Sequence, residues 1–376
     1  MIVLGILGIV IVLSTLWDGF ETIVMTRSVS RNWRLSRIFY FLIRAPYYKL
    51  VAKVRQERWR NALLMIYPPL SLIVLFSLWG GFIIFGFALI NYGFAVEHSS
   101  GALDPFSAWY YSGVTFLTLG FGDIAPVGTL GRVLAVLEAA TGLVFLASVI
   151  SYLPVMYGVV QKREYAIVLL DSKAGSDPAG FELLRRHDAA GTMHILPAFL
   201  EKYEQWGAEM LEAYLSYPTI AFYRSQHDTQ SWIKTSTAIL DACALIETCY
   251  RAEDERAKAL KFQARATFAS LRHVIVDLAY IIKMPPTEDC TFRLSLQDFK
   301  LGIDELNASA PSFAENYDAL TRLRHLYEPY CVALGQGLLM DLPKWRHATH
   351  EPDNWEVAAW DGAQHVNEAN QIGAGR

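Results

Sequence analysis

Residues 104–123 read DPFSAWYYSGVTFLTLGFGD, and the organisation of the whole chain follows from this stretch. Asp104 is a favourable N-cap, and Pro105 suits the first helical position because its missing N–H would have no helical partner there. A helix from Pro105 to about Leu117 would be roughly 20 Å long, which is too short to cross a hydrocarbon core of about 30 Å. The stretch therefore predicts a short re-entrant helix.

The segment after this helix, residues 118–123, reads TLGFGD. Gly120 and Gly122 can adopt backbone dihedrals that are closed to other residues, so successive carbonyl groups can turn toward one axis. Such a row of oxygens can replace the water shell of a monovalent cation. The preceding helix also directs the negative end of its dipole at the same axis. We therefore expect residues 118–123 to bind a cation.

Residues 111–123, YSGVTFLTLGFGD, resemble the pore signature of potassium channels, and especially that of the two-transmembrane and two-pore-domain members. The resemblance implies coordination of potassium ions by the carbonyl groups and one hydroxyl of a selectivity filter formed by Thr118, Leu119, Gly120, Phe121, Gly122 and Asp123. Phe121 stands where many members have Tyr. Leu119 stands where the channels have Val or Ile, and Leu117 stands where most of them have a second Thr. These two differences leave open how strictly the protein would select potassium over sodium.

The composition indicates a protein that is partly in the membrane and partly soluble, since 53% of its 376 residues are hydrophobic and 19% are charged. Residues 1–160 carry 11 Lys and Arg against 7 Asp and Glu, whereas residues 161–376 carry 22 against 30. The acidic second part argues against nucleic acid as a partner. Four cysteines lie in this part without a C-x-x-C pair, which favours reduced core thiols over metal ligands, at positions Cys243, Cys249, Cys290 and Cys331.

Residues 1–25 form an apolar segment that predicts a retained transmembrane helix. Asp18 and Glu21 lie on one face of it, where they would either contact Arg27 or another helix, or reach the lipid headgroups. Residues 26–60 follow with ten Lys and Arg and one acid, Glu57. By the positive-inside rule this segment is cytoplasmic and the N-terminus lies outside.

Aromatic and basic residues alternate in residues 26–60, which predicts amphipathic helices lying in the membrane interface. The segment could bind anionic lipids that regulate the protein, or could only anchor its topology, and the sequence leaves both open. The candidate lipid contacts are Arg31, Arg34, Arg37, Arg44 and Lys49.

Residues 61–160 are expected to form the pore domain. An outer span covers residues 61–92, with Pro68 and Pro69 near its inner end, and a short polar loop follows in which His98 is either solvated or pH-sensing. The inner span is predicted from about Leu130 to Val160. The resemblance to potassium channels implies three gating candidates in it. These are Glu138 as a brace behind the filter, Gly142 as a hinge, unless it is a packing glycine, and Pro154 as a weak point where the inner helices converge.

Residues 161–340 show helical periodicity and no sustained alternation, which predicts a helical cytoplasmic domain, and residues 341–376 form a polar tail. The domain has no G-x-G-x-x-G after a strand, and its histidines lack metal-ligand spacing. We expect an unidentified ligand or protein to bind this domain. Trp206 and Trp232 are expected in its core.

The predicted fold class is an all-α membrane protein with a potassium-channel-like pore domain, an extra N-terminal transmembrane helix and a C-terminal helical cytoplasmic domain. One chain supplies one wall of a fourfold filter, so four copies must assemble. We expect a homotetrameric potassium channel of the cell membrane that conducts passively, with membrane lipids as partners, no enzyme activity and no cofactor other than potassium ions in the filter. Two alternatives remain, namely a non-selective cation channel and a membrane signalling or scaffolding protein with a vestigial pore.

Overall fold

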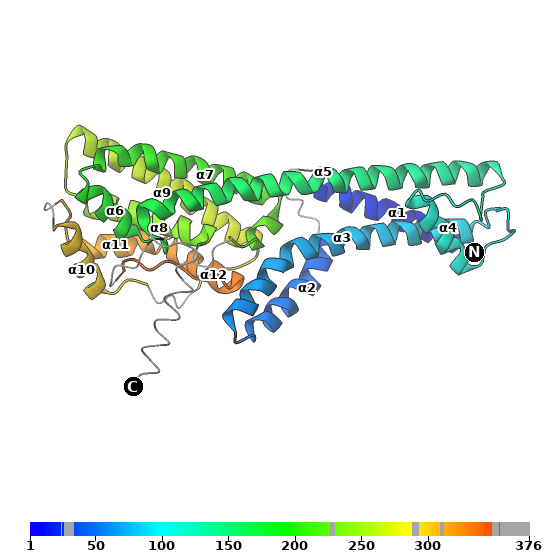
Figure 1. Cartoon of the computed structure of the whole chain (residues 1–376), viewed down its shortest axis with the longest axis horizontal. Helices are drawn as coiled ribbons and strands as arrows, with labels where there is room; N and C mark the ends of the chain where they lie inside the picture. Colours follow the sequence, from blue (N-terminus) through cyan, green and yellow to red (C-terminus); the bar gives the residue numbers. More distant parts are fainter. Residues whose placement is uncertain are drawn as a thin grey trace, which may run out of the picture. The chain divides into compact units, whose positions relative to one another are not determined.

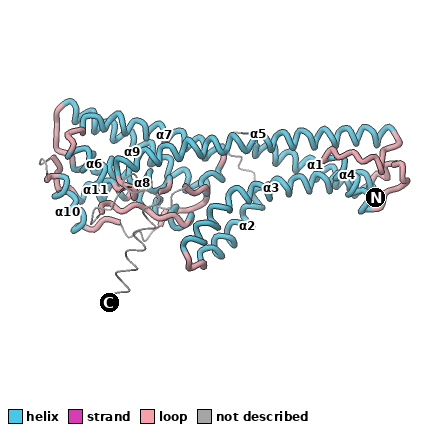
Figure 2. Tube along the Cα trace, in the orientation of Figure 1, coloured by secondary structure: helices cyan, strands magenta, loops and turns pink. Residues whose placement is uncertain are grey.

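The computed structural model of the chain (Figure 1) describes residues 1–23, 25, 34–225, 230–287, 293–308, 312–347 and 353. The chain divides into two compact units, Met1–Gly158 and Val159–Arg376. Figure 2 shows helices joined by loops and no strand over the described ranges. The all-α fold class predicted from the sequence is confirmed. Arg27, Arg31 and Cys290, which the sequence analysis considered, lie outside the described residues.

The first unit holds the membrane-spanning part of the protein. It consists of α1 (Ile2–Ile23), α2 (Leu35–Ala52), α3 (Glu57–Gly93), α4 (Pro105–Phe116) and the part of α5 (Thr129–Ala174) that ends at Gly158. Within the described ranges, α1, α3 and α5 are the helices long and apolar enough to cross a membrane. At 12 residues, α4 is too short to do so.

Helix α1 packs closely along α3 through glycines. A Cβ atom added to Gly8 would collide with the backbone carbonyl of Gly86, and one added to Gly93 would collide with the backbone of Gly5. Small residues allow two helices in a membrane to approach until their backbones touch. The additional N-terminal helix is therefore an integral part of the first unit.

A buried polar cluster joins α1, α2 and α3. The carboxylate of Asp18 accepts hydrogen bonds from the backbone N–H of Ser36 at 2.9 Å and from Nε1 of Trp79 at 2.9 Å. Nε of Arg34 lies 3.3 Å from Oδ1 of Asp18 and 3.4 Å from Oε2 of Glu21. Both acids are buried. Of the two alternatives for this pair, the structure supports contact with other elements of its own unit, and Arg34 is a basic partner among the described residues. Arg27 lies outside the described residues.

Helix α5 is longer than the inner span expected from the sequence. The predicted end lay near Val160, but the helix continues to Ala174. The polar run Gln161–Arg163 ends the apolar stretch without breaking the helix, because none of its residues disfavours helical dihedrals. The helix ends where Gly175 adopts a φ of +92°.

The second unit is built around α8, whose residues are almost all buried, including the predicted core residues Trp232 and Cys243. Trp206, Cys249 and Cys331 are also buried, as expected. Around α8 lie residues 159–174 of α5 and the elements α6 (Gly180–Ala189), η1 (Met193–Ile195), α7 (Leu196–Ser216), η2 (Pro218–Phe222), α9 (Glu255–Ile281), α10 (Leu296–Leu306), α11 (Tyr317–Arg324) and α12 (Glu328–Leu338).

Opposite charges are paired inside this unit. Asp241 of α8 accepts a hydrogen bond from Tyr327 at 2.6 Å and is 2.9 Å from Arg293, while Arg324 contacts Glu328 at 2.8 Å. Burial raises the pKa of Asp241 to about 6, although the charge of Arg293 opposes this rise. Two arginines and two acids thus compensate one another in the core, and loss of one partner would leave a buried charge unpaired.

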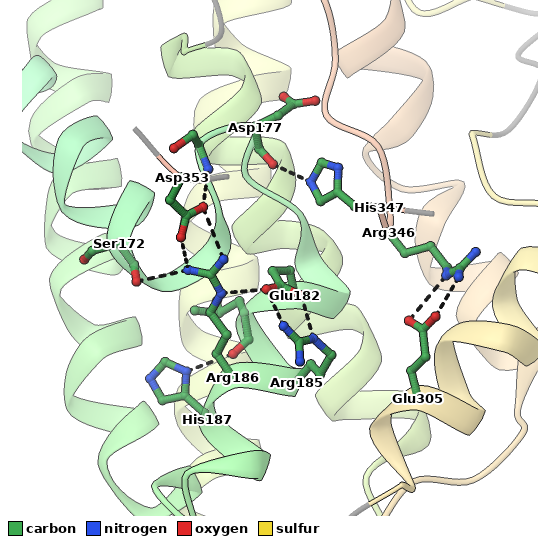
Figure 3. Close-up of polar contacts among 12 residues, drawn as sticks. Ser172, Asp177, Glu182, Arg185, Arg186, His187, Glu305, Arg346, His347 and Asp353 are labelled. Atoms are coloured by element: carbon green, nitrogen blue, oxygen red, sulfur yellow. Dashed lines mark hydrogen bonds and ion pairs between the residues drawn. The ribbon is translucent and has the colours of Figure 1, made fainter. Parts of the chain in front are cut away.

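The last described residues belong to the second unit. Figure 3 shows Arg186 of α6 held by Asp353, with contacts of 2.7 and 3.2 Å, and His347 bonded to the Asp177 carbonyl at 2.7 Å. Asp353 also accepts from the backbone N–H of Ser176 at 3.2 Å. His347 and Asp353 therefore contact the loop after α5 and α6, and the polar tail over residues 341–376 stays a prediction.

Candidate ion pathway

The short helix α4 begins where the sequence predicted. Oδ1 of Asp104 accepts hydrogen bonds from the backbone N–H groups of Phe106 at 2.9 Å and Ser107 at 3.2 Å, and Pro105 is the first helical residue. The helix ends at Phe116, and Leu117 caps it. Asp104 thus fixes the start of α4, and the dipole of the helix is negative at the end that leads into residues 118–123.

The backbone after α4 alternates in conformation. Thr118, Gly120 and Gly122 have φ values of +55°, +61° and +78°, whereas Leu119 and Phe121 do not have positive φ. The N–H groups of Thr118 and Leu119 bond back to the Thr115 and Val114 carbonyls at 3.1 and 2.9 Å. This alternation is the geometry by which successive peptide carbonyls can turn to the same side, so the segment is suited to binding a cation with backbone oxygens.

The sequence analysis foresaw the two glycines but not the positive φ of Thr118. A β-branched residue with positive φ is a rare outlier that costs about 1–2 kcal/mol and commonly marks a functional segment. Thr118 lies two residues before Gly120, which itself lies two residues before Gly122. This spacing could have predicted the positive φ of Thr118.

Residues 118–123 are largely left uncovered by the rest of the described chain. Leu119 is 54% exposed and Phe121 is 67% exposed, and a Cβ atom added to Gly120 or Gly122 would meet no atom within 4 Å. Asp123 is also exposed, and Tyr110 of α4 hydrogen-bonds it. One chain therefore presents one open wall of a potential ion pathway.

A buried polar group lies behind α4. Nδ2 of Asn91 in α3 donates to Oγ of Ser112 in α4 at 3.3 Å, and the carboxyl group of Glu138 in α5 faces both. All three residues are buried. Three helices thus meet at a polar contact directly behind the helix that precedes the filter. The sequence singled out Glu138, but not Asn91 and Ser112, because nothing in their local pattern distinguishes them from other polar residues in apolar helices.

The other two gating candidates lie in an unbroken α5. A Cβ atom on Gly142 would collide with the carbonyl oxygen of Phe116 at the end of α4, so this glycine permits close packing of the two helices. Pro154 is exposed and does not end the helix. The packing role of Gly142 is visible in the structure, and its role as a hinge stays a prediction, as does that of Pro154.

His98 lies in the loop before α4 and is only 4% exposed, so the expectation of a solvated loop histidine is wrong. Its Nδ1 is 2.7 Å from the Val96 carbonyl, and its ring stacks edge-on against Tyr111 of α4 with centroids 4.5 Å apart. Ser99 and Ala125 exchange two hydrogen bonds of 2.8 and 3.0 Å, which join this loop to the segment after the filter. The loop folds over His98 because of these bonds.

The candidate lipid contacts on α2 fall into two groups. Arg34, just before α2, turns inward to Asp18 and Glu21. Arg37 and Arg44 are partly exposed and Lys49 is exposed. Large apolar side chains of the same helix, Phe41 and Leu42, are also exposed. Helix α2 thus has the mixed basic and apolar surface of an interfacial helix.

Over the described ranges, no group of three or more His, Cys, Asp or Glu side chains is arranged to hold a metal ion. That residues 118–121 bind a monovalent cation through backbone oxygens stays a prediction.

Comparison with known proteins supports this view of the first unit. A 139-residue match, 31% identical, covers 36% of this chain and 39% of an uncharacterized membrane protein of Bacillus subtilis, YdjJ. An 85-residue match, 35% identical, covers 19% of this chain and 63% of protein LctB of Geobacillus stearothermophilus. The chain thus spans less than two thirds of either relative, and no solved structure matches it. Residues 72–157 match the model of an ion channel family, and the described part of the chain has three helices long and apolar enough to cross a membrane.

Proposed function

We propose that four copies of this chain assemble into a potassium-selective channel whose ions pass along the backbone oxygens of residues 118–121. The observation that carries this proposal is the alternating positive φ at Thr118, Gly120 and Gly122 in a segment that its own chain leaves uncovered. Oxygens from a single segment surround a cation on one side only. Four symmetry-related segments complete its coordination.

The surface of α5 supports assembly. In the most apolar 18-residue stretch of α5, only 11% of the residues are buried within the chain. In the corresponding stretch of α3, 50% are buried. Apolar side chains that include Val136, Leu143 and Leu146 are exposed along it. Neighbouring copies would cover part of this surface, and lipid tails would cover the rest.

The basic segment sets the proposed orientation. Residues 26–60 with their ten Lys and Arg would face the cytoplasm, so the N-terminus and the loop with His98 would face the outside of the cell membrane and the second unit would be cytoplasmic. Helix α2 would lie in the inner interface, with Arg37, Arg44 and Lys49 near lipid headgroups. The second unit would regulate opening or stabilise the tetramer.

The test is single-channel recording from purified protein in planar bilayers, with potassium on one side and sodium on the other. We expect a reversal potential displaced toward the potassium equilibrium potential. A reversal potential near zero would instead support the non-selective cation channel, for which Leu117 and Leu119 are the relevant departures from the common filter.

Gly120→Asp in the same assay addresses the scaffold alternative. This variant places a carboxylate and a Cβ atom at a position with positive φ in the filter, and it should abolish current while the oligomer forms normally. Protein that carries no current before the substitution, in any lipid tested, would favour a vestigial pore.

A further inference from the structure

Residues 341–347, DLPKWRH, contain neither helix nor strand, yet the second unit encloses one of their side chains almost completely. Trp345 is only 2% exposed. The Cζ atoms of Arg293 and Arg324 lie over its ring, at 5.5 and 5.1 Å from the ring centroid, and the ring of Phe181 is 6.1 Å away. Guanidinium groups attract an aromatic face at such distances, most strongly where water is excluded. Trp345 therefore occupies a site that is chemically suited to an aromatic ring.

The main chain around Trp345 is bound as well. The backbone N–H of Phe181 donates to the carbonyl group of Trp345 at 3.2 Å, and Nη1 of Arg293 donates to that of Pro343 at 2.5 Å. The two donors come from α6 and from the stretch before α10, which are both distant in sequence from this segment. Hydrogen bonds to the main chain, together with a site for one side chain, are the means by which domains bind extended peptides. Residues 343–345 are thus held as a peptide ligand is held.

The edge of this contact is polar and charged. Figure 3 shows Arg346 directed at Glu305 of α10, with 2.6 Å between Nη2 and Oε1, and His347 bonded to the Asp177 carbonyl at 2.7 Å. Asp298 of α10 lies 3.9 Å from Arg346, and both acids on α10 are exposed. A buried aromatic anchor with a solvated polar rim is the anatomy of a protein–protein interface. The two acids favour a basic residue directly after the tryptophan.

The site does not depend on the segment that fills it. Asp241 lies 2.9 Å from Arg293, and Glu328 lies 3.0 Å from the same arginine. Glu328 is also 2.8 Å from Arg324. Both acids are 0% exposed and belong to α8 and α12, so they hold the two guanidinium groups in place without a contribution from Trp345. A site that is already arranged in this way binds a ligand at a lower entropic cost.

We propose that the second unit contains a peptide-binding site built from one aromatic and two guanidinium groups with an acidic rim, namely Phe181, Arg293, Arg324, Asp298 and Glu305. Its ligand is an extended peptide that carries a tryptophan followed by a basic residue. In this structure the chain's own residues 341–347 supply that ligand, as a segment tethered to the site. The proposal concerns the second unit alone and does not depend on the proposed tetramer or on ion selectivity.

Hydrogen exchange of the full-length protein in detergent, followed by mass spectrometry, tests the proposal. Trp345→Ala removes the ring, so exchange at the Phe181 amide should become at least about tenfold faster, because its carbonyl partner is no longer held against it. The amides of α8 should keep their exchange rates, since the paired charges around Asp241 remain. The matched control is Lys344→Ala, which replaces the exposed neighbour of Trp345 and should leave both regions unchanged.

Addition of a peptide tests recognition itself. A synthetic peptide of residues 341–347, in excess, should slow exchange at Phe181 in the Trp345→Ala protein toward the original rate. The same peptide with Trp345→Ala should have no effect. Arg346→Glu in the full-length protein is a second, milder variant, because it turns the ion pair with Glu305 into a repulsion without removing the ring. It should also accelerate exchange at Phe181, and the unmodified peptide should again restore protection.

Other results would overturn the proposal. Unchanged exchange at Phe181 in both variants would mean that residues 341–347 are not held through this site. If the amides of α8 and Phe181 were accelerated equally in Trp345→Ala and in Arg346→Glu, Trp345 would be an ordinary core residue of one cooperative unit. Failure of the unmodified peptide to restore protection in either variant would mean that the site does not recognise a peptide.

Discussion

Thr118 shows how a single residue connects backbone energetics with the proposed ion pathway. Its positive φ costs about 1–2 kcal/mol relative to the ordinary region. The backbone hydrogen bonds of Thr118 and Leu119 to the last turn of α4 offset part of this cost, because they hold the chain in place directly after the helix. The backbone strain at Thr118 thus lies at the start of residues 118–122, in which residues with positive φ alternate with residues of ordinary φ.

The first prediction concerns the conformational requirement at Gly120. Gly120→Ala should lower the potassium preference, because alanine at a φ of +61° is disfavoured by about 1 kcal/mol and a relaxed backbone would turn the carbonyl groups out of line. The matched control is Gly128→Ala in the loop after the filter, where φ is not positive and an added Cβ meets no atom within 4 Å. Reversal potentials with potassium and sodium on opposite sides report the effect. An unchanged potential for Gly120→Ala would argue against the filter.

The second prediction concerns pH. Burial lowers the pKa of His98 below its ordinary value of 6.5, so the ring is neutral at pH 7. Since the exposed form of this loop would bind a proton more readily than the folded form, the buried arrangement is stable above pH 6.5 and loses stability as the pH falls below it. Acidification of the side that holds the loop should therefore change the open probability.

His98→Gln tests this expectation, because glutamine can keep a hydrogen bond but does not titrate in this range. Currents recorded at pH 7 and at about pH 5 should differ in the original protein and agree in the variant. The control is His273→Gln on α9, an exposed histidine that is paired with Asp277. If His98→Gln retained the full pH response, another group would have to be responsible.

At the scale of single elements, the α1–α3 interface depends on backbone contact between glycines. Gly86→Val should destabilise the first unit by about 1–3 kcal/mol, since the added side chain would overlap with Val12 and with the backbone of α1. Gly81→Val is the control on the same helix, because an added Cβ there meets no atom within 4 Å. Thermal unfolding in detergent measures the difference. Equal melting temperatures for the two variants would contradict this packing.

The elements also show what could be predicted from sequence. The start of α4, its length and the alternating glycines depend on neighbouring residues, so the pattern D-P and the string TLGFGD were sufficient. Contacts between distant segments were not predictable in this way. The burial of His98 depends on Tyr111 and on the pairing of its loop with Ala125. The inward turn of Arg34 depends on Asp18, which lies on another helix. Charge alone had suggested a lipid contact for this arginine.

The whole molecule combines a pore domain with a second unit of different composition. The first unit carries the exposed segment 118–123, and the second contains a compensated charge network around Asp241 and the contacts of Asp353 with Arg186. The only covalent connection between the two units is α5 at Gly158. Because this helix also carries Glu138 and Gly142, any change in the second unit that moves α5 would act on the residues behind the filter.

Removal of the second unit tests this division of roles. A chain that ends at Gln161 keeps the filter and all three spanning helices, so its ion preference should equal that of the full chain. Its open probability should change, because the remaining part of α5 is no longer held by the second unit. Single-channel recording of the fraction with the mass of four chains measures both quantities in one experiment. A shifted reversal potential would mean that the second unit shapes the filter itself, and an unchanged open probability would mean that it has no part in gating.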